Sequence, residues 1–251
     1  MLVLLARRSD SAARALCGRA PPGAARVLGW RDLSTPGWRY YANPDDGEDA
    51  AVLEGDLIAD TAISAVVTRC SSVPPDELSH IVPSDRGYVA AEMTATLLAW
   101  LARLPCPVIN RATATSLCGP RWYPEQWTML ATSLGLRAVP RTRRAVPGLV
   151  PSHPVVISPP GFEQYSVTVV GPRVIEPAGH GDEPQPELSD DARAIARAAQ
   201  LTLLRVHWAL RGAEHWFLGA DFDFDLAAAP VADALLDHVG LGTRQPAGAA
   251  P

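Results

Sequence analysis

Three aspartates alternate with two phenylalanines near the end of the chain, in the stretch Asp221-Phe222-Asp223-Phe224-Asp225. Side chains two apart on a β-strand point to the same face, so a strand here presents the three carboxylates together. Carboxylate oxygens are ligands that suit Mg²⁺. The spacing therefore marks a candidate metal site. It also fits a simpler structure, a solvated strand end that leads into a turn, because acidic side chains lie mostly on protein surfaces.

The composition is that of an ordinary soluble globular protein. The 251 residues are 47% hydrophobic and 20% charged, which is compatible with one large domain or two small ones. The 27 acidic and 22 basic residues give a net charge of -5, so the balance indicates no nucleic-acid or membrane partner. Every basic residue is an arginine, which excludes a lysine Schiff base and a phosphate-binding lysine.

The cysteines and the first residues favour a cytoplasmic protein. The chain has four cysteines and no CxxC pair, which argues against a zinc ribbon and a disulfide scaffold. The apolar run at residues 1–6 is too short for a signal peptide or a membrane span, and two arginines follow it directly. We interpret this run as a first strand.

Hydrophobic patterns along the chain predict an α/β fold. In the first half they predict strands over 2–6, 62–69 and 108–110 and helices over 11–16 and 84–104. A further helix is expected over 124–134, and the proline-rich stretch 140–160 is typical of a boundary or linker. The second half predicts a hairpin over 165–176, a helix over 192–204 capped by residues 189–191, a second hairpin from residue 204, and a closing helix over 231–239.

The order of these elements resembles the ATP-grasp superfamily, nearest to its RimK-like and peptide-maturase ligases. The motifs that carry the resemblance are the hairpin Val169-Val170-Gly171-Pro172-Arg173-Val174-Ile175, the strand end Val66-Val67-Thr68-Arg69, and the segment from Trp122-Tyr123-Pro124 to Val139-Pro140-Arg141-Thr142. The resemblance spans nearly the whole chain. It implies a pre-ATP-grasp-like α/β domain at 1–120, a reduced α+β ATP-grasp-like domain at 121–242, and a disordered tail at 243–251.

The resemblance also implies a site for Mg²⁺ and ATP. In the family, a Glu-Xaa-Asn pair on the final strand and an acid on the preceding strand bind the metal. The matching residues here are Asp221, Asp223 and His207. An imidazole is a poor ligand for Mg²⁺ and a better one for a transition metal.

The family's lid subdomain, with its glycine-rich loop and phosphate-contacting lysines, has no counterpart in this sequence. About two dozen proline-rich residues stand in its place, between Arg141 and Ser166. The remaining candidates for phosphate contact are Arg141, Arg143 and Arg144, whose planar guanidinium groups differ from an ammonium in geometry.

Three functions follow from these residues. The favoured one is a degenerate ATP-grasp-like protein, a binding or accessory component of a bacterial peptide- or amino-acid-modifying system. The second is an active carboxylate–amine ligase, in which the arginines hold ATP, Asp221 and Asp223 hold Mg²⁺, and an acyl phosphate forms. The third is a metal-dependent hydrolase or binding module that uses His207 with both aspartates. We expect a peptide or amino-acid substrate or a partner enzyme, and a homodimer.

Overall fold

The computed structural model describes residues 1–139, 159–177, 186–212 and 214–242. The chain divides into two units: unit 1 comprises Met1–Arg121 together with the segment from Asp225 onward, and unit 2 comprises Trp122–Phe224. Unit 2 begins next to the boundary predicted after residue 120. The closing helix, which we placed in the second domain, is part of unit 1, and the predicted tail at 243–251 lies outside the described residues.

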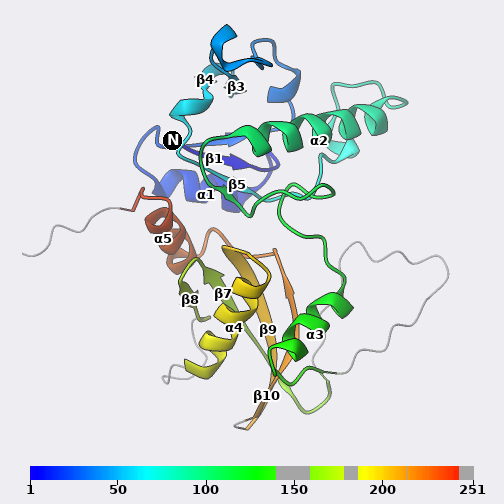
Figure 1. Ribbon diagram of the computed structural model, residues 1–251, viewed down its shortest axis with the longest axis vertical. Helices are drawn as coiled ribbons and strands as arrows, with labels where there is room; N and C mark the ends of the chain where they lie inside the picture. The colour runs from blue at the N-terminus through cyan, green and yellow to red at the C-terminus, as the bar shows by residue number, and fades with distance from the viewer. Residues whose placement is uncertain (140–158, 178–185, 213, 243–251) are drawn as a thin grey trace, which may run out of the picture. The chain divides into compact units, whose positions relative to one another are not determined.

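Unit 1 is built on a parallel sheet with the strand order β2-β1-β5-β6. Figure 1 labels its two central strands, β1 and β5. A two-stranded antiparallel hairpin, β3–β4, is separate from this sheet. The elements of unit 1 are β1 (Leu2–Leu5), α1 (Ser11–Arg19), β2 (Ala25–Leu28), β3 (Ala50–Leu53), β4 (Asp56–Ala59), β5 (Ala65–Thr68), α2 (Arg86–Arg103), β6 (Val108–Ile109) and α5 (Ala229–His238), with short 3₁₀ turns at Asp32–Ser34, Pro44–Asp46, Asp60–Ala62 and Pro75–Glu77.

The first strand is buried along its whole length, as the apolar run at the start of the sequence predicts. All four residues of β1 are inaccessible to solvent, because the strand lies inside a parallel sheet whose two faces are both covered. Val3 and Leu5 share a core with Leu97 and Trp100 of α2. Leu2 and Leu4 alternate with them and so face the opposite side.

Unit 2 contains an antiparallel sheet with the strand order β10-β9-β7-β8. Its elements are α3 (Pro124–Ser133), β7 (Glu163–Val170), β8 (Arg173–Ile175), α4 (Pro186–Ala198), β9 (Leu203–Arg211) and β10 (Glu214–Asp221). Both predicted hairpins are confirmed, β7–β8 with its turn at Gly171 and Pro172, and β9–β10. The outer edge of β10 is extended by residues 137–139, since the Phe217 N–H donates to the Arg137 carbonyl at 2.8 Å and the Val139 N–H donates to the Phe217 carbonyl at 3.0 Å.

The two faces of the unit 2 sheet differ in character. One face packs against α3 and α4 in an apolar core, in which Val167 and Val206 contact Ile195 and its neighbours. Residues on the other face alternate with these along each strand. This second face carries Ser166 and Arg205, and the site described below lies on it.

Helix α4 corrects one prediction from the sequence. We expected it over 192–204 with a cap at residues 189–191, but it runs over Pro186–Ala198 and includes those residues. The buried residues of the helix begin at Leu188, four residues before the start that we predicted at residue 192. The helix ends early because Gln200 adopts a left-handed conformation, with φ of 57°, and Leu201 N–H bonds back to the Ala196 carbonyl.

The described helices include none with the length and apolar character that a bilayer crossing requires.

Candidate functional site

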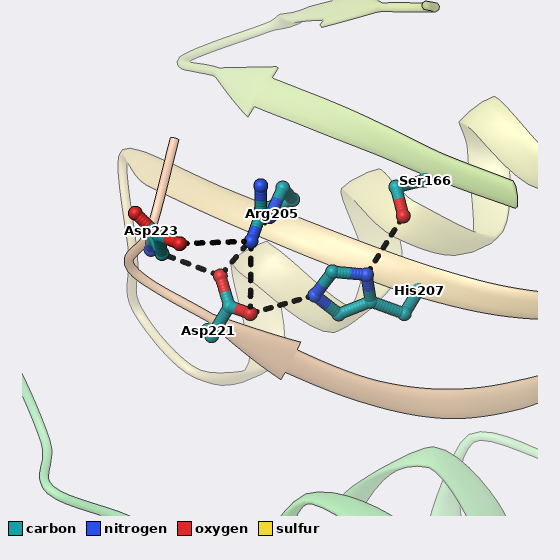
Figure 2. Close-up of polar contacts among 5 residues, drawn as sticks. All are labelled: Ser166, Arg205, His207, Asp221 and Asp223. Carbon is teal, nitrogen blue, oxygen red and sulfur yellow. Dashed lines mark hydrogen bonds and ion pairs between the residues drawn. The ribbon is translucent and has the colours of Figure 1, made fainter. Parts of the chain in front are cut away.

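Four side chains meet on the second face of the unit 2 sheet, and strand register brings them together. Ser166 of β7 lies directly opposite His207 of β9, and Arg205 of β9 lies opposite Asp221 of β10. Arg205 and His207 are two residues apart on one strand, so they share this face. Asp223 follows the end of β10 and joins the group (Figure 2).

His207 connects a serine to an aspartate through its two ring nitrogens. Its Nε2 lies 2.7 Å from Oδ2 of Asp221, and its Nδ1 lies 2.7 Å from Oγ of Ser166 (Figure 2). An ionised carboxylate only accepts hydrogen bonds, so the Nε2–H of His207 donates to Asp221. In the neutral ring Nδ1 then accepts the hydroxyl hydrogen of Ser166. His207 is only 4% exposed, and both ring nitrogens have partners.

Arg205 places its guanidinium between the two aspartates. Its Nε donates to Oδ1 of Asp221 at 3.2 Å, and its Nη2 lies 3.4 Å from Oδ2 of Asp221 and 3.3 Å from Oδ2 of Asp223. The backbone N–H of Asp223 also donates to Oδ1 of Asp221, at 2.9 Å. The Asp221 side chain is 29% exposed and that of Asp223 is 89% exposed, so Asp221 is the centre of the network and Asp223 its solvent edge.

The network stabilises the ionised form of Asp221. Burial by itself would raise the pKa of this carboxyl. The hydrogen bond and electrostatic interaction with His207, the N–H of Asp223 and the charge of Arg205 outweigh burial, and the pKa is lowered from its ordinary value. Asp221 is therefore a carboxylate at neutral pH, held by donors from its own chain.

The side chains of this network are not arranged to bind Mg²⁺. Mg²⁺ requires oxygen ligands in near-octahedral geometry at about 2.0–2.1 Å. Both oxygens of Asp221 already accept N–H groups, and the guanidinium of Arg205 lies where a cation between the two aspartates would be. Within the part of the chain that the structure describes, no three His, Cys, Asp or Glu side chains are grouped to hold a metal ion.

The structure brings together part of the predicted site. His207 and Asp221 are in contact, and Asp223 adjoins Asp221 through its N–H group. Asp225 takes another role, because its Oδ1 accepts the Ala227 N–H at 2.8 Å. The arginines at 141, 143 and 144 lie outside the described residues, so their contact with phosphate stays a prediction.

Two residues of the network, Ser166 and Arg205, were absent from the sequence-based site. The signal for Arg205 was present, since it is two residues before His207 on a predicted strand. Ser166 lies 41 residues from His207 in sequence, and only the register of β7 on β9 pairs them.

Solved structures of two macrocyclases and a RiPP-associated ATP-grasp ligase share the architecture of this chain over nearly its full length. The macrocyclase MdnB from Microcystis aeruginosa MRC is 16% identical over 96% of this chain and 99% of its own, with a TM-score of 0.63. The macrocyclase MdnC from the same organism, bound with precursor peptide MdnA, is 11% identical over 95% of this chain and 98% of its own, with a TM-score of 0.62. A RiPP-associated ATP-grasp ligase from Chryseobacterium gregarium, in complex with ADP and a leader and core peptide, is 10% identical over 94% of this chain and 96% of its own, with a TM-score of 0.59.

The chain has the ATP-grasp fold. The resemblance drawn from its motifs is confirmed at this level, over nearly its full length. No protein-family profile and no curated protein sequence matches the chain. The TM-scores of 0.59–0.63 support the shared architecture, whereas identities of 10–16% leave the chemistry to be argued from the site itself.

Proposed function

We propose that this ATP-grasp-fold protein is a binding or accessory component of a peptide-modifying system and does not itself carry out Mg·ATP-dependent ligation. The peptide part of the proposal is supported by the similar structures, since MdnC is bound with a precursor peptide and the Chryseobacterium ligase holds a leader and core peptide. The second part rests on the network around Asp221.

The observation that carries the proposal is the saturation of the Asp221 carboxylate. Its oxygens accept hydrogen bonds from Arg205, His207 and the Asp223 N–H, so groups of the protein itself satisfy the carboxylate without a ligand. Binding of Mg²⁺ at this position would either displace the guanidinium or bring two positive charges together in a partly buried site. A ligase of this fold depends on metal and positioned charge to transfer a phosphoryl group. The site as folded therefore favours binding over ligation.

Isothermal titration with Mg·ATP tests the absence of ligation. We expect no binding heat and no release of ADP when a carboxylate and an amine are supplied together. Micromolar binding of Mg·ATP with ATP turnover would contradict the proposal. If that turnover were lost in the Asp221→Ala, Asp223→Ala double variant, the protein would be an active ligase that uses these residues for Mg²⁺.

Fluorescence anisotropy with labelled peptides of acidic, basic and apolar composition tests the binding role. We expect saturable binding of at least one class, with the same affinity in EDTA and in Mg²⁺. Absence of binding by all classes would contradict a peptide-binding role, and binding that requires Mg²⁺ would contradict a metal-free site.

A further inference from the structure

We infer that the guanidinium of Arg205 replaces a divalent cation between Asp221 and Asp223, so that this chain holds its acidic strand end together with an internal positive charge. The inference rests on the proposed function and adds the residue responsible. It also predicts the behaviour of a variant. Without the guanidinium, the carboxylates of Asp221 and Asp223 and the imidazole of His207 become available to a metal ion.

The geometry of the contacts supports a bridging role. One nitrogen, Nη2 of Arg205, lies 3.4 Å from an oxygen of Asp221 and 3.3 Å from an oxygen of Asp223. The Asp223 N–H holds the two acids in a fixed turn by bonding to Asp221 at 2.9 Å. A single cation therefore contacts two carboxylates that are two residues apart, at ion-pair distances.

The charges in this cluster account for the exclusion of metal. Two carboxylates face one guanidinium, and the Arg205 side chain is 30% exposed, so its charge is only partly screened by water. A divalent ion that approached Asp221 would meet a positive charge within a few ångströms. Without Arg205 the cluster keeps both negative charges, and the described part of the chain supplies no other arginine contact to them.

His207 is able to change from donor to ligand. A metal ion needs the lone pair of Nε2, which now carries hydrogen toward Asp221. The proton can move to Nδ1, because the hydroxyl oxygen of Ser166, 2.7 Å away, accepts as well as it donates. An imidazole with two carboxylates suits Zn²⁺ or Mn²⁺ better than Mg²⁺.

The variant Arg205→Met tests the inference, with Arg193→Met as a matched control. Arg193 forms an ion pair with Asp190 at 2.7 Å on the surface of α4, so its loss removes one charge from the same unit and leaves the site intact. Binding is measured with Zn²⁺ by titration calorimetry, with Mn²⁺ by electron paramagnetic resonance, and with Co²⁺ by its visible absorption. We expect Arg205→Met to bind one ion at least about 100-fold more tightly than the wild-type protein or Arg193→Met. Adding Asp221→Asn to Arg205→Met should abolish that gain.

The inference is overturned if folded Arg205→Met gains no affinity for any of the three ions. It is also overturned if the wild-type protein binds one Mn²⁺ that Asp221→Asn abolishes, a measurement that does not depend on the folding of Arg205→Met. These results are separate from the test of function. Turnover of ATP by the wild-type protein contradicts the proposed function, whereas failure of Arg205→Met to bind metal contradicts only the role of Arg205.

Discussion

The substitution Asp221→Asn removes one negative charge from the centre of the network and keeps the size of the side chain. Oδ1 of Asp221 accepts the Asp223 N–H and the Nε–H of Arg205, and an amide oxygen in its place keeps both bonds. The amide NH₂ then faces Nε2 of His207. The ring accommodates it by moving its hydrogen to Nδ1 and donating to Ser166, while Nη2 of Arg205 loses its 3.4 Å contact with Oδ2 and keeps Asp223 as its acceptor.

The expected cost follows from what the charge contributed. A hydrogen bond to a charged group contributes about 1.5–3 kcal/mol, against about 0.5–1.5 kcal/mol for a neutral one, so the buried bond with His207 loses about 1 kcal/mol. The ion pair with Arg205 has distances of 3.2–3.4 Å and is partly exposed, so it adds between 0 and about 1 kcal/mol. We therefore expect Asp221→Asn to destabilise unit 2 by about 1–2 kcal/mol at pH 7. Asp221→Leu should cost about 3 kcal/mol or more, because it leaves His207 and the Asp223 N–H without an acceptor.

The difference between Asp221→Asn and wild type should depend on pH. The pKa of Asp221 is lower in the folded protein than in the unfolded chain, so its stabilising contribution is present above the unfolded value of about 3.9 and is lost as the pH falls through the folded value. Hydrogen exchange of the β9 and β10 amides at neutral and acidic pH measures this within unit 2. Equal protection of the two proteins at pH 7, or a difference that does not shrink in acid, would refute the role given to the charge.

Three further predictions test the packing within each unit. Trp208 is fully buried and its indole N–H has no hydrogen-bond partner among the described residues, so Trp208→Phe should change the free energy of unfolding by less than about 1.5 kcal/mol and Trp208→Ala should cost about 3–5 kcal/mol, as measured by urea denaturation. Deletion of residues 229–251 should reduce hydrogen-exchange protection of β1 and β5 and leave β9 unchanged, because α5 belongs to unit 1. His215 contacts Asp191 of α4 at 3.1 Å, so His215→Ala should cost about 1 kcal/mol in urea denaturation, and adding Asp191→Ala should cost little more.

Elements with a strong local pattern could be predicted from the sequence. Helix α2 was expected over 84–104 and runs over Arg86–Arg103, because apolar residues recur at helical spacing and Pro105 follows. The hairpin β7–β8 was marked by a Gly-Pro turn between β-branched runs. The start of α4 was misplaced because Ser189, Asp190 and Asp191 are typical helix caps, and the buried Leu188 that extends the helix backward was not weighed against them.

The polar site was harder to predict because its contacts depend on register between distant strands. Alternation along β10 marked Asp221 as a candidate metal ligand, but it treated three aspartates as equivalent. The strand ends at Asp221, so Asp223 and Asp225 are not held on its face. The partner that decides the chemistry, Arg205, lies 16 residues before Asp221, and a local motif does not reveal that pairing.

The two faces of the unit 2 sheet would let an ATP-grasp fold persist under the proposed loss of metal-dependent ligation. The helix-covered face contributes the apolar contacts of Val167, Val206 and Trp208, and these do not depend on what lies on the other face. On that other face, a polar side chain is tolerated only where each buried donor meets an acceptor. His207 meets this condition through Ser166 and Asp221, and Arg205 meets it through two aspartates. Side chains that satisfy one another's hydrogen bonds would keep this face of the sheet folded without a bound metal ion. The variant Arg205→Met tests whether a metal ion binds once the guanidinium is removed.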